Sequence, residues 1–494
     1  MIHLKKLGIM DIGSNSIKLL IANLYSERYF DITYEKKIQF RMGQFIDSKK
    51  DLTTEGFYKL RDILSYFKHI CEVEEVTDIK AIATETMRRL KNSENIIHQL
   101  QHQLHITIEL IPGELEAYYG YLATHHTIDL SDYLQIDIGG SSMEIVLVKQ
   151  KQLIHAISLP LGAIITTKNF ELDSSLTKDK EKLFNAHMKQ TFEEISWLKD
   201  AIHLPVIGIG GTIRTISKLY RNRIGDSLKL QHQYHLSDTN LEEMYQLLAP
   251  LTLKDRQELK GLSKDRADIV LGCLMTIRSL FNYIDSKSLI INRYGIRQGV
   301  IFNQLNIPPQ SVLDYSLSNL LYHYRLPIHH NDRLKQSSIT LANQLQINDL
   351  SSTNILKASS KLSDIGQIIS YQNNSKHTFY LLMNISINGL NVKEQLMTAY
   401  TIRAGEKYNL KIEPEHQMLL STEEFEHCKK LSLIVQLCSY LNALKSEFNS
   451  IDVSEETISI KFSKTIPSPY LIRLNQLSTL YLEQFNRPLK LIII

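Results

Sequence analysis

The chain has 494 residues, of which 43% are hydrophobic and 22% charged, a composition typical of ordinary globular proteins. At roughly 100–200 residues per domain, this length predicts about three domains. The formal net charge is only +3, which excludes a global electrostatic attraction for nucleic acid or membranes, so a polyanionic ligand would need a local basic cluster.

Strand-like and helix-like segments alternate over residues 1–125. The segments "LGIMDIG", "SIKLLIANLY" and "YFDITYEKKIQF" are typical of strands. They are followed by a helix over "TTEGFYKLRDILSYFKHICEV", capped by Thr53 or Thr54, and by the strand "DIKAIATE". The segment "TMRRLKNSENIIHQLQHQL" predicts one helix, with Arg88 and Arg89 at its beginning. The strand "ITIELIP" and the helix "GELEAYYGYLATHH" end this region.

The alternation restarts near residue 126 with "YLQIDIGGSSMEIVLVKQ". A long helix is expected near residues 176–200, and the later segments "LPVIGIGGTIRTISKLY", "DRADIVLGCLMTIRSLFNYI" and "SLIINRYGIRQGVIFNQL" continue the α/β pattern. After Pro308 and Pro309 the chain becomes mainly helical, with strands expected at "TISIKFSK" and "PLKLIII". We therefore predict three domains, over residues 1–125, 126–305 and 306–494.

One short phrase occurs twice in the chain. "MDIGSNSIKLL" begins at Met10 and "IDIGGSSMEIV" begins at Ile136, so Asp11 aligns with Asp137, 126 residues later. Each copy reads as a strand, a turn of small residues and a second strand. Two α/β units with matching hairpins predict a duplicated fold with a cleft between its halves.

The repeated turns suit phosphate and metal chemistry. Glycine lets the backbone approach a ligand closely, so successive N–H groups can cradle an anion. Asp11 and Asp137 are hard oxygen ligands suited to Mg²⁺, directly or through water. One such loop alone is usually a simple hairpin, but two in equivalent positions favour a functional interpretation. The candidate phosphate-binding residues of the two turns are Gly13, Ser14, Asn15, Ser16, Gly139, Gly140, Ser141 and Ser142.

Further candidates lie outside the repeat. Gly210, Gly211 and Thr212 follow a strand and open a helix, which indicates either an anion site or only a tight turn. Arg88 and Arg266 could each clamp a phosphate. Arg88 could instead lie on a solvated helix face, and Arg266 could equally be a structural ion-pair partner of Asp265 or Asp268. The acids Glu114, Glu116 and Glu144 are candidates for a general base, and Glu144 stands where the first repeat has Lys18.

Eight segments together resemble the exopolyphosphatase and guanosine pentaphosphate phosphohydrolase (Ppx/GppA) family, over residues 8–303. They are "DIGSNSIKLLI", "AIATETMRRLKN", "IPGELEAYYGYLA", "IDIGGSSMEIVL", "SLPLGA", "GIGGTIRTISKL", "LSKDRADIVLG" and "YGIRQG", in the family's order. The resemblance implies an α/β fold of duplicated ribonuclease H-like domains, as in actin, sugar kinases and Hsp70, with a cleft and a C-terminal α-rich domain of degenerate HD type.

The resemblance also implies residue roles. Glu116 would be the general base, Asp137 and Glu144 would hold the water or Mg²⁺ together with Asp11, and Arg88 would grip the terminal phosphates. The second loop departs from the family pattern, because Ser141 replaces a glycine and Met143 a threonine. Ser141 would be strained if its position required a positive φ. In "GELEA", Leu115 stands where the family often has a second glutamate, which leaves Glu116 as the clearer base.

The C-terminal region departs further from its implied type. The usual His-Asp pair reads Ser363-Asp364 here, and the paired histidines read Asn374-Ser375. A hydrolase of the HD type needs His and Asp ligands on its metal, so we expect the domain to keep the fold without the metal site. Lys376 and His377 could contact a polyanion or could be ordinary surface residues.

The leading functional hypothesis is a Mg²⁺-dependent exopolyphosphatase that removes terminal orthophosphate from inorganic polyphosphate. The alternatives are a guanosine pentaphosphate (pppGpp) 5′-phosphohydrolase, a superfamily ATPase or sugar kinase, and a catalytically weakened polyphosphate or nucleotide sensor.

We expect a cytoplasmic protein, since no apolar run is long enough to span a membrane and no signal peptide is evident. The cysteines Cys71, Cys273, Cys428 and Cys438 are expected to be reduced. The family resemblance implies a homodimer, with no nucleic-acid or membrane partner.

Overall fold

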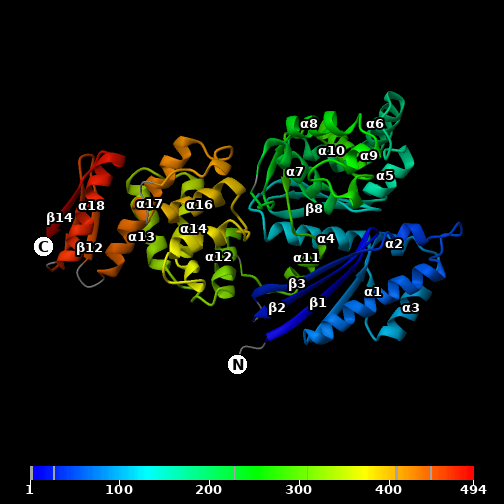
Figure 1. Cartoon of the computed structure of the whole chain (residues 1–494), viewed down its shortest axis with the longest axis horizontal. Coiled ribbons are helices and arrows are strands. Elements are labelled where there is room, and N and C mark those ends of the chain that lie inside the picture. Colours follow the sequence, from blue (N-terminus) through cyan, green and yellow to red (C-terminus); the bar gives the residue numbers. More distant parts are fainter. Residues whose placement is uncertain are drawn as a thin grey trace. The chain divides into compact units, whose positions relative to one another are not determined.

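A computed structural model describes residues 4–25, 28–226, 228–308, 310–405, 410–444, 448–464 and 466–494, so Pro309 of the predicted domain junction lies outside the described residues. The chain divides into two compact units. One comprises residues 1–225 and 231–312, and the other comprises residues 226–230 and 313–494. The first unit contains two sheets, and the second is mainly helical (Figure 1).

The first lobe of the N-terminal unit is built on a five-stranded sheet with the order β3-β2-β1-β4-β5. Helices α1 and α3 pack against each other, and α1 also contacts β1 and β2 (Figure 1). Its elements are β1 (Leu4–Ile12), β2 (Ser16–Tyr25), β3 (Tyr29–Gln39), η1 (Met42–Phe45), α1 (Thr54–Val73), β4 (Asp78–Ala83), α2 (Glu85–Arg88), α3 (Ser93–Leu104) and β5 (Ile108–Leu110).

The local sequence explains most of this lobe. Thr53 caps α1 by accepting a hydrogen bond from the Gly56 N–H (3.2 Å), and the apolar face of α1 is buried as its spacing predicts. The prediction of one helix over residues 86–104 is wrong, because α2 ends at Arg88 and α3 begins at Ser93. The break is held by Asn92, whose amide exchanges two hydrogen bonds with the backbone of Leu52. That contact comes from a distant part of the chain, so helical periodicity could not reveal it.

The second lobe is built on a six-stranded sheet with the order β10-β11-β9-β6-β7-β8. Helix α4 packs on one side, against β6, β7 and β8, while α7 packs against β6, β9 and β11 (Figure 1). Its elements are α4 (Gly113–His125), β6 (Tyr133–Ile138), β7 (Met143–Lys149), β8 (Gln152–Leu159), α5 (Ala163–Phe170), α6 (Lys178–Glu193), η2 (Ser196–Ala201), β9 (Val206–Ile209), α7 (Gly211–Ile224), β10 (His235–Ser237), α8 (Asp238–Leu248), α9 (Leu253–Gln257), η3 (Lys264–Arg266), α10 (Val270–Ile284), β11 (Ser288–Ile291) and α11 (Ile296–Phe302).

The two sheets repeat one topology, as the duplicated phrase predicts. In each, three antiparallel strands in sequence (β1–β3 and β6–β8) are followed by two strands in parallel pairing on the other side of the first of them (β4 and β5, and β9 and β11). In the second sheet, β10 adds an antiparallel edge strand beside β11. The same hairpin therefore lies at the same place in each lobe. Helix α4 follows the first sheet in the chain but packs on the second, and α11 packs closely against it.

The C-terminal unit is mainly helical and ends in a small sheet with the order β12-β13-β14. Its elements are α12 (Val312–His323), α13 (Asp332–Gln344), α14 (Leu350–Leu362), η4 (Ile365–Ile368), α15 (Asn374–Leu382), α16 (Val392–Ala404), η5 (Pro414–His416), α17 (Thr422–Ala443), β12 (Phe448–Val453), β13 (Ile458–Phe462), α18 (Ser468–Phe485) and β14 (Leu489–Ile493). The two strands expected near the C-terminus are β13 and β14. Strand β12 was not expected.

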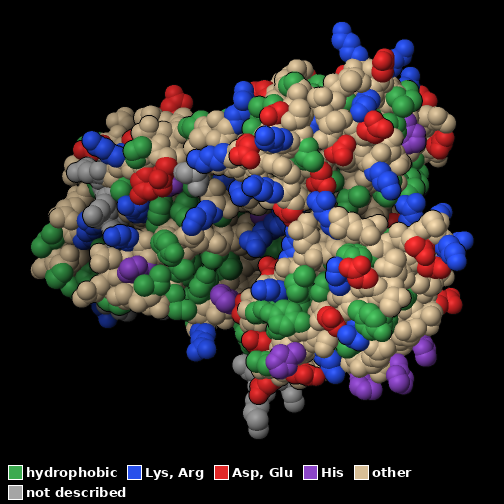
Figure 2. All heavy atoms as spheres, turned by 45° about the vertical axis from the view of Figure 1, so that its right-hand side comes forward, with side chains coloured by type: hydrophobic (Ala, Val, Ile, Leu, Met, Phe, Trp, Pro, Cys, Tyr) green, Lys and Arg blue, Asp and Glu red, His purple; other side chains and the backbone are tan. Residues whose placement is uncertain are grey.

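Two expectations drawn from composition can be checked directly. All four cysteines are buried and free, in line with reduced thiols. No helix of the described chain combines the length and apolarity that a membrane crossing needs. Basic and acidic side chains are interspersed on the face drawn in Figure 2, in keeping with the small net charge.

Candidate active site

The two repeated phrases form hairpins with the same register. Asp11 pairs with Lys18 across β1 and β2, and Asp137 pairs with Glu144 across β6 and β7. In each hairpin the aspartate lies one residue before the end of its strand, directly before the turn of small residues. Lys18 and Glu144 therefore occupy equivalent places in the two lobes.

Both turns line a cavity of about 360 Å³ between the lobes. Most of the candidate residues named from the sequence contribute to its lining. These are Asp11, Gly13, Ser14, Asn15, Ser16, Glu116, Asp137, Gly139, Gly140, Ser141, Ser142, Glu144, Gly211 and Thr212. Three candidates, Arg88, Gly210 and Glu114, lie outside the lining.

The two turns pack directly against each other. A Cβ atom on Gly140 would lie 2.3 Å from Ser14 Oγ and 2.9 Å from Ile164 Cδ1, so a larger residue here would force these side chains to move. Thr86 and Ser141 are joined by a hydrogen bond between their hydroxyl groups (2.8 Å). Ser141 is not among the residues with positive φ, so replacing the family's glycine at this position introduces no left-handed strain. The other departure, Met143, is fully buried.

The carboxylate of the first hairpin has a cation beside it. Asp11 is 4% exposed, and its Oδ2 lies 3.0 Å from Lys18 Nζ. Ion pairing of this kind lets a buried carboxylate keep its charge. The first hairpin therefore places a lysine of the neighbouring strand directly beside its aspartate.

Among the described residues, the acids of the second hairpin, Asp137 and Glu144, have no basic side chain within ion-pair distance. Burial raises the pKa of Asp137 to about 6, with Lys18 opposing and Asp11 adding to the effect. Burial, followed by the charges of Glu116 and Asp137, raises the pKa of Glu144 well above its ordinary value. Ser158 donates a hydrogen bond to Glu144 Oε1 (2.7 Å), which favours the ionised form. Without a bound cation, Asp137 and Glu144 therefore take up a proton more readily than exposed acids do.

Glu116 lies in the first turn of α4, next to the same acids. A Cβ on Gly113 would lie 2.5 Å from Ser158 Cβ, so the start of α4 presses against the strand that supports Glu144. Burial raises the pKa of Glu116 to about 8, and Arg88 partly opposes this. A pKa in this range suits a general base near neutral pH. Glu114, in the same turn, is exposed to solvent.

Arg88 faces the acids rather than the cavity. Its guanidinium lies 3.2 Å from Glu116 Oε2 and 2.9 Å from Glu85 Oε2, and it donates to the Ile111 carbonyl (2.5 Å). In this arrangement Arg88 positions Glu116. The neighbouring Arg89 is about half exposed. The role of Arg88 toward phosphate, which the resemblance implies, stays a prediction.

The third glycine loop supports the cavity from the second lobe. Gly210 has a φ of +117°, and a Cβ there would lie 2.8 Å from the Ile138 carbonyl oxygen. This glycine lets β9 turn into α7 directly behind Asp137. Gly211 and Thr212 then line the cavity at the N-terminus of α7, where free N–H groups favour an anion.

Basic side chains also line the cavity, and the sequence did not single out most of them as candidates. They are Lys18, Lys36, Lys37, Arg214, Arg266 and Arg297. Lys37 pairs with Lys18 across β2 and β3, so the row of neighbours across the sheet runs Asp11, Lys18, Lys37. Burial, and then Arg266, lowers the pKa of Lys37. Because the net charge of the chain is small, a polyanionic ligand would need a local basic cluster, and these side chains form one.

Sequence signals existed for only some of these cations. Arg214 and Arg297 lie within the segments "GIGGTIRTI" and "YGIRQG", a few residues after a glycine turn, and could have been proposed from that position. Burial, followed by the charges of Arg266, Arg293 and Arg297, lowers the pKa of Arg214 to about 10. Lys36 and Lys37 lie in an unremarkable strand segment, and only strand pairing brings them to the cavity.

The donor set of the cavity suits a hydrated divalent cation. Asp11, Asp137 and Glu144 do not all bring a carboxylate oxygen within 4.8 Å of one another in the described chain. Mg²⁺ usually keeps several waters and takes one or two carboxylates plus substrate phosphates, so it does not need a closed protein cage. Asn15 Oδ1, in the first turn, is a buried acceptor without a hydrogen-bond partner. The residues therefore fit Mg²⁺ bound partly through water.

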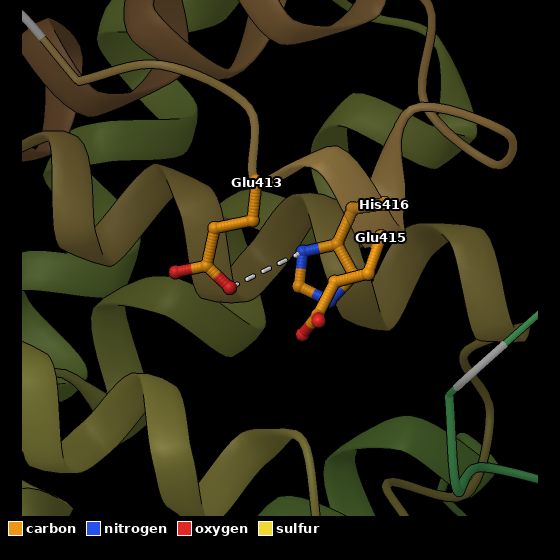
Figure 3. A group of neighbouring side chains, drawn as sticks. All are labelled: Glu413, Glu415 and His416. Atoms are coloured by element: carbon orange, nitrogen blue, oxygen red, sulfur yellow. Dashed lines mark ion pairs between the residues drawn. The ribbon is translucent and has the colours of Figure 1, made fainter.

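A compact group of possible metal ligands lies in the C-terminal unit, and its contacts argue against a metal. Glu413, Glu415 and His416 cluster around η5 (Figure 3). Tyr400 accepts a hydrogen bond from the Glu413 N–H, and its hydroxyl lies 2.8 Å from His416 Nδ1. Glu413 is already paired with Arg403. The histidine nitrogen and the carboxylate thus have protein partners, and the cluster is explained as structural.

The altered HD positions of the C-terminal unit bond to one another. Asn374 donates to the Ser363 carbonyl (2.8 Å), and Asn331 donates to Ser363 Oγ (3.0 Å). Asp364 Oδ2 lies 2.9 Å from His330 Nε2. Lys376 is exposed. The expected descent from an HD-type domain stays a prediction.

Comparison with known proteins agrees with this geometry. The model of the Ppx/GppA phosphatase family matches residues 20–307, and that of Ppx/GppA phosphatase domain III matches residues 312–477. The chain therefore belongs to the Ppx/GppA phosphatase family. Guanosine-5′-triphosphate,3′-diphosphate pyrophosphatase of Aeromonas hydrophila is 22% identical over 470 residues, which cover 94% of this chain and 92% of that protein. Exopolyphosphatase 1 of Mycobacterium bovis is 25% identical over 309 residues, 61% of this chain and 88% of that protein.

Solved structures show the same fold. A Ppx/GppA family member from Aquifex aeolicus aligns with a TM-score of 0.54 at 23% identity, covering 61% of this chain and 97% of its own. An exopolyphosphatase from Cytophaga hutchinsonii aligns with a TM-score of 0.57 at 20% identity, covering 61% and 99%. The N-terminal unit thus has the actin-like, sugar-kinase-type α/β fold that the resemblance implied.

Proposed function

We propose that this chain is a Mg²⁺-dependent exopolyphosphatase, which hydrolyses the terminal phosphoanhydride bond of inorganic polyphosphate and releases orthophosphate. The observation that carries the proposal is the composition of the cavity. Two glycine-rich turns face each other there among buried carboxylates and six Lys and Arg residues. Among the described residues its lining includes three isoleucines and no aromatic side chain, which suits a linear phosphate chain better than a base that must stack.

The terminal phosphoryl group would lie between the two turns. Backbone N–H groups at Gly13–Asn15, at Gly140–Ser142 and at the start of α7 would bind its oxygens, as in other anion cradles, while the Gly139 N–H closes the second turn by donating to the Ser142 carbonyl (3.0 Å). The Lys and Arg group would balance the next phosphates along the chain. Because both lobes contribute donors, the phosphoryl group would be oriented for in-line attack from the side where the glutamates lie.

Glu116 is the proposed general base. Its raised pKa places the ionised form within reach near neutral pH, and Arg88 holds its Oε2 in place. Asp11, Asp137 and Glu144 would hold Mg²⁺, in part through water. When bound, Mg²⁺ supplies positive charge that offsets the charge on the phosphoryl oxygens. Glu116 would orient the attacking water and take its proton.

A second candidate function is hydrolysis of the 5′-terminal phosphate of guanosine pentaphosphate. It is supported by the Aeromonas hydrophila relative, whose similarity spans nearly the whole chain, including the C-terminal unit. The similarity to the Mycobacterium bovis exopolyphosphatase covers only 61% of this chain. Polyphosphate activity should fall steeply with added salt, because a long polyanion neutralises many basic groups. Guanosine pentaphosphate activity should instead show selectivity for guanine.

The deciding experiment measures orthophosphate release by the purified protein with Mg²⁺, from long-chain polyphosphate and from guanosine pentaphosphate in parallel. Faster turnover of polyphosphate is the expected result. Glu116→Ala should abolish release while leaving polyphosphate binding largely intact, whereas Glu114→Ala, in the same helical turn, should behave as the parent protein. Preference for the nucleotide would establish the second candidate. Tight binding without release of phosphate from either substrate would indicate a sensor and would refute the proposed enzyme.

A further inference from the structure

Two segments from opposite lobes are joined at the edge of the cavity. Arg41 follows β3 of the first lobe, and its guanidinium makes two bonds to the Asp268 carboxylate of the second lobe (2.8 and 3.1 Å). The same guanidinium donates to the Asp265 carbonyl (2.8 Å). Nearby, Lys37 Nζ lies 3.4 Å from Asp265 Oδ2. Lys37 lines the cavity, whereas Arg41 lines a neighbouring surface groove, so the Arg41–Asp268 pair lies at the rim.

The backbone of Arg41 is built on the first phosphate turn. The N–H groups of Phe40 and Arg41 both donate to the Asn15 carbonyl (3.1 and 3.2 Å), and the Met42 N–H donates to the Ser14 carbonyl (2.9 Å). Arg41 has φ 39° and ψ 61°, in the left-handed region that non-glycine residues rarely occupy. Such a conformation persists only where the surroundings fix it, and the bonds to the turn do so.

On the other side, the pair holds the segment that carries Arg266. Asp265 and Asp268 flank this arginine in the chain. The Arg266 guanidinium covers Gly211 so closely that a Cβ there would lie 2.2 Å from Nη2. It also donates to Thr215 Oγ1 (3.0 Å). A continuous set of contacts thus runs from the first phosphate turn through Arg41 to the cation above the N-terminus of α7.

We propose that Arg41 is a positioning residue for the phosphatase reaction, and that its pair with Asp268 clasps the two lobes around the bound phosphates. This inference rests on the proposed function, since it assigns Arg41 to the same cavity. The phosphate-binding groups come from both lobes, so they converge only when the lobes are held together. Each partner of the pair is about one quarter exposed, with side-chain exposures of 26% and 25%. Water can therefore compete with the clasp, which suits a contact that opens for substrate entry.

The kinetic test uses Arg41→Ala, Asp268→Ala, the double variant and the charge swap Arg41→Asp with Asp268→Arg. Loss of one charge-assisted bidentate contact should raise KM for polyphosphate by about 10-fold, with a smaller change in kcat. The double variant should be no worse than either single variant, and the swap should restore part of the loss. Arg61→Ala is the matched control, because Arg61 pairs with Asp62 within one helix and spans no cleft.

A second measurement does not depend on catalysis. Spin labels on Glu55→Cys of α1 and Lys189→Cys of α6 report the distance between the lobes, since both sites are exposed and the native cysteines are buried. Arg41→Ala should broaden the distance distribution, and the charge swap should narrow it again. An unchanged distribution in Arg41→Ala, or additive KM effects in the double variant, would overturn the clasp. A broadened distribution in a protein that releases no phosphate would uphold the clasp and refute only the proposed function.

Discussion

The side chain of Glu116 is only 16% exposed, and we predict that replacing this proposed base by glutamine stabilises the folded protein. With divalent cations removed, the pKa of Glu116 in the folded protein rises from 4.5 to about 8. At pH 7 most folded molecules therefore hold Glu116 protonated and about one tenth hold the ionised form that acts as a base, whereas the unfolded chain carries it ionised. Since folding then requires proton uptake, the free energy of unfolding falls as the pH rises from about 4.5 to about 8. The glutamine of Glu116→Gln resembles the protonated acid and does not titrate, so the free energy of unfolding of this variant does not fall in the same way as the pH rises.

The magnitude follows from the pH interval. The value pH 7 lies about 2.5 units above the pKa of Glu116 in the unfolded chain. Keeping Glu116 protonated in the folded protein at this pH therefore lowers the free energy of unfolding by roughly 3 kcal/mol, at 1.36 kcal/mol per unit. At pH 5 the same cost is under roughly 1 kcal/mol. Glu116→Gln should therefore melt about 5 °C above the parent protein at pH 7 and close to it at pH 5. Glutamine still accepts from Arg88, so the neighbouring contact is preserved.

The assay is thermal unfolding from pH 5 to pH 8 with divalent cations removed, followed by circular dichroism. Glu114→Gln is the matched control, because this residue lies in the same turn of α4 and is exposed. Equal melting temperatures of Glu116→Gln and the parent protein at pH 7 and pH 8 would show that Glu116 ionises normally. That result would refute the argument that burial poises it as a base.

Three further predictions concern the same cavity. Gly140→Ala should lower phosphate release at least about 10-fold, because its Cβ would meet Ser14 Oγ at 2.3 Å and push the turns apart, while Gly43→Ala, which has open space around it, should not. Mg²⁺ binding should release protons at pH 6 and fewer at pH 9, because Asp137 and Glu144 have raised pKa values. Calorimetry in buffers of different ionisation enthalpy can measure this release. Proton release that stays constant with pH would contradict the assignment of the two acids as ligands. Ser158→Ala should move the rising limb of the pH–rate profile to higher pH, because the hydroxyl stabilises ionised Glu144; an unmoved limb would remove Glu144 from the rate-controlling ionisations.

The features that sequence analysis predicted well depend on local residue patterns. A strand, a turn of glycine and serine, and a second strand need only neighbouring residues, so the duplicated phrase revealed both hairpins. The equivalence of Lys18 and Glu144 also followed from the alignment alone, and the strand registers bear it out. Glycines at Gly140 and Gly210 mark close backbone approaches, where a larger residue would force neighbouring atoms to move.

The features that sequence analysis missed depend on contacts between distant segments. Lys37 reaches the cavity because β3 pairs with β2, and nothing in "YEKKIQ" marks it as different from a surface strand. The helix break before Ser93 depends on the bond between Asn92 and Leu52. Arg88 was assigned to phosphate, but its surroundings include two glutamates from different helices, and only the fold brings Glu116 beside it.

Lys18 occupies the position in the first lobe that Glu144 occupies in the second, so the two halves of the duplicated fold have different electrostatics. In the first hairpin, Lys18 Nζ lies 3.0 Å from Asp11 Oδ2, so this hairpin supplies its aspartate with a cation of its own. In the second, Asp137 and Glu144 are both acids, and Glu116 from α4 adds a third whose charge Arg88 only partly offsets. Three buried acids with raised pKa values attract a divalent cation far more strongly than a balanced pair does. We therefore expect Lys18→Glu to create a second acidic hairpin that binds Mg²⁺ but no longer holds phosphate, because the row of cations beside Lys37 would lose its first member. Unchanged affinity for polyphosphate in that variant would contradict this division between the lobes.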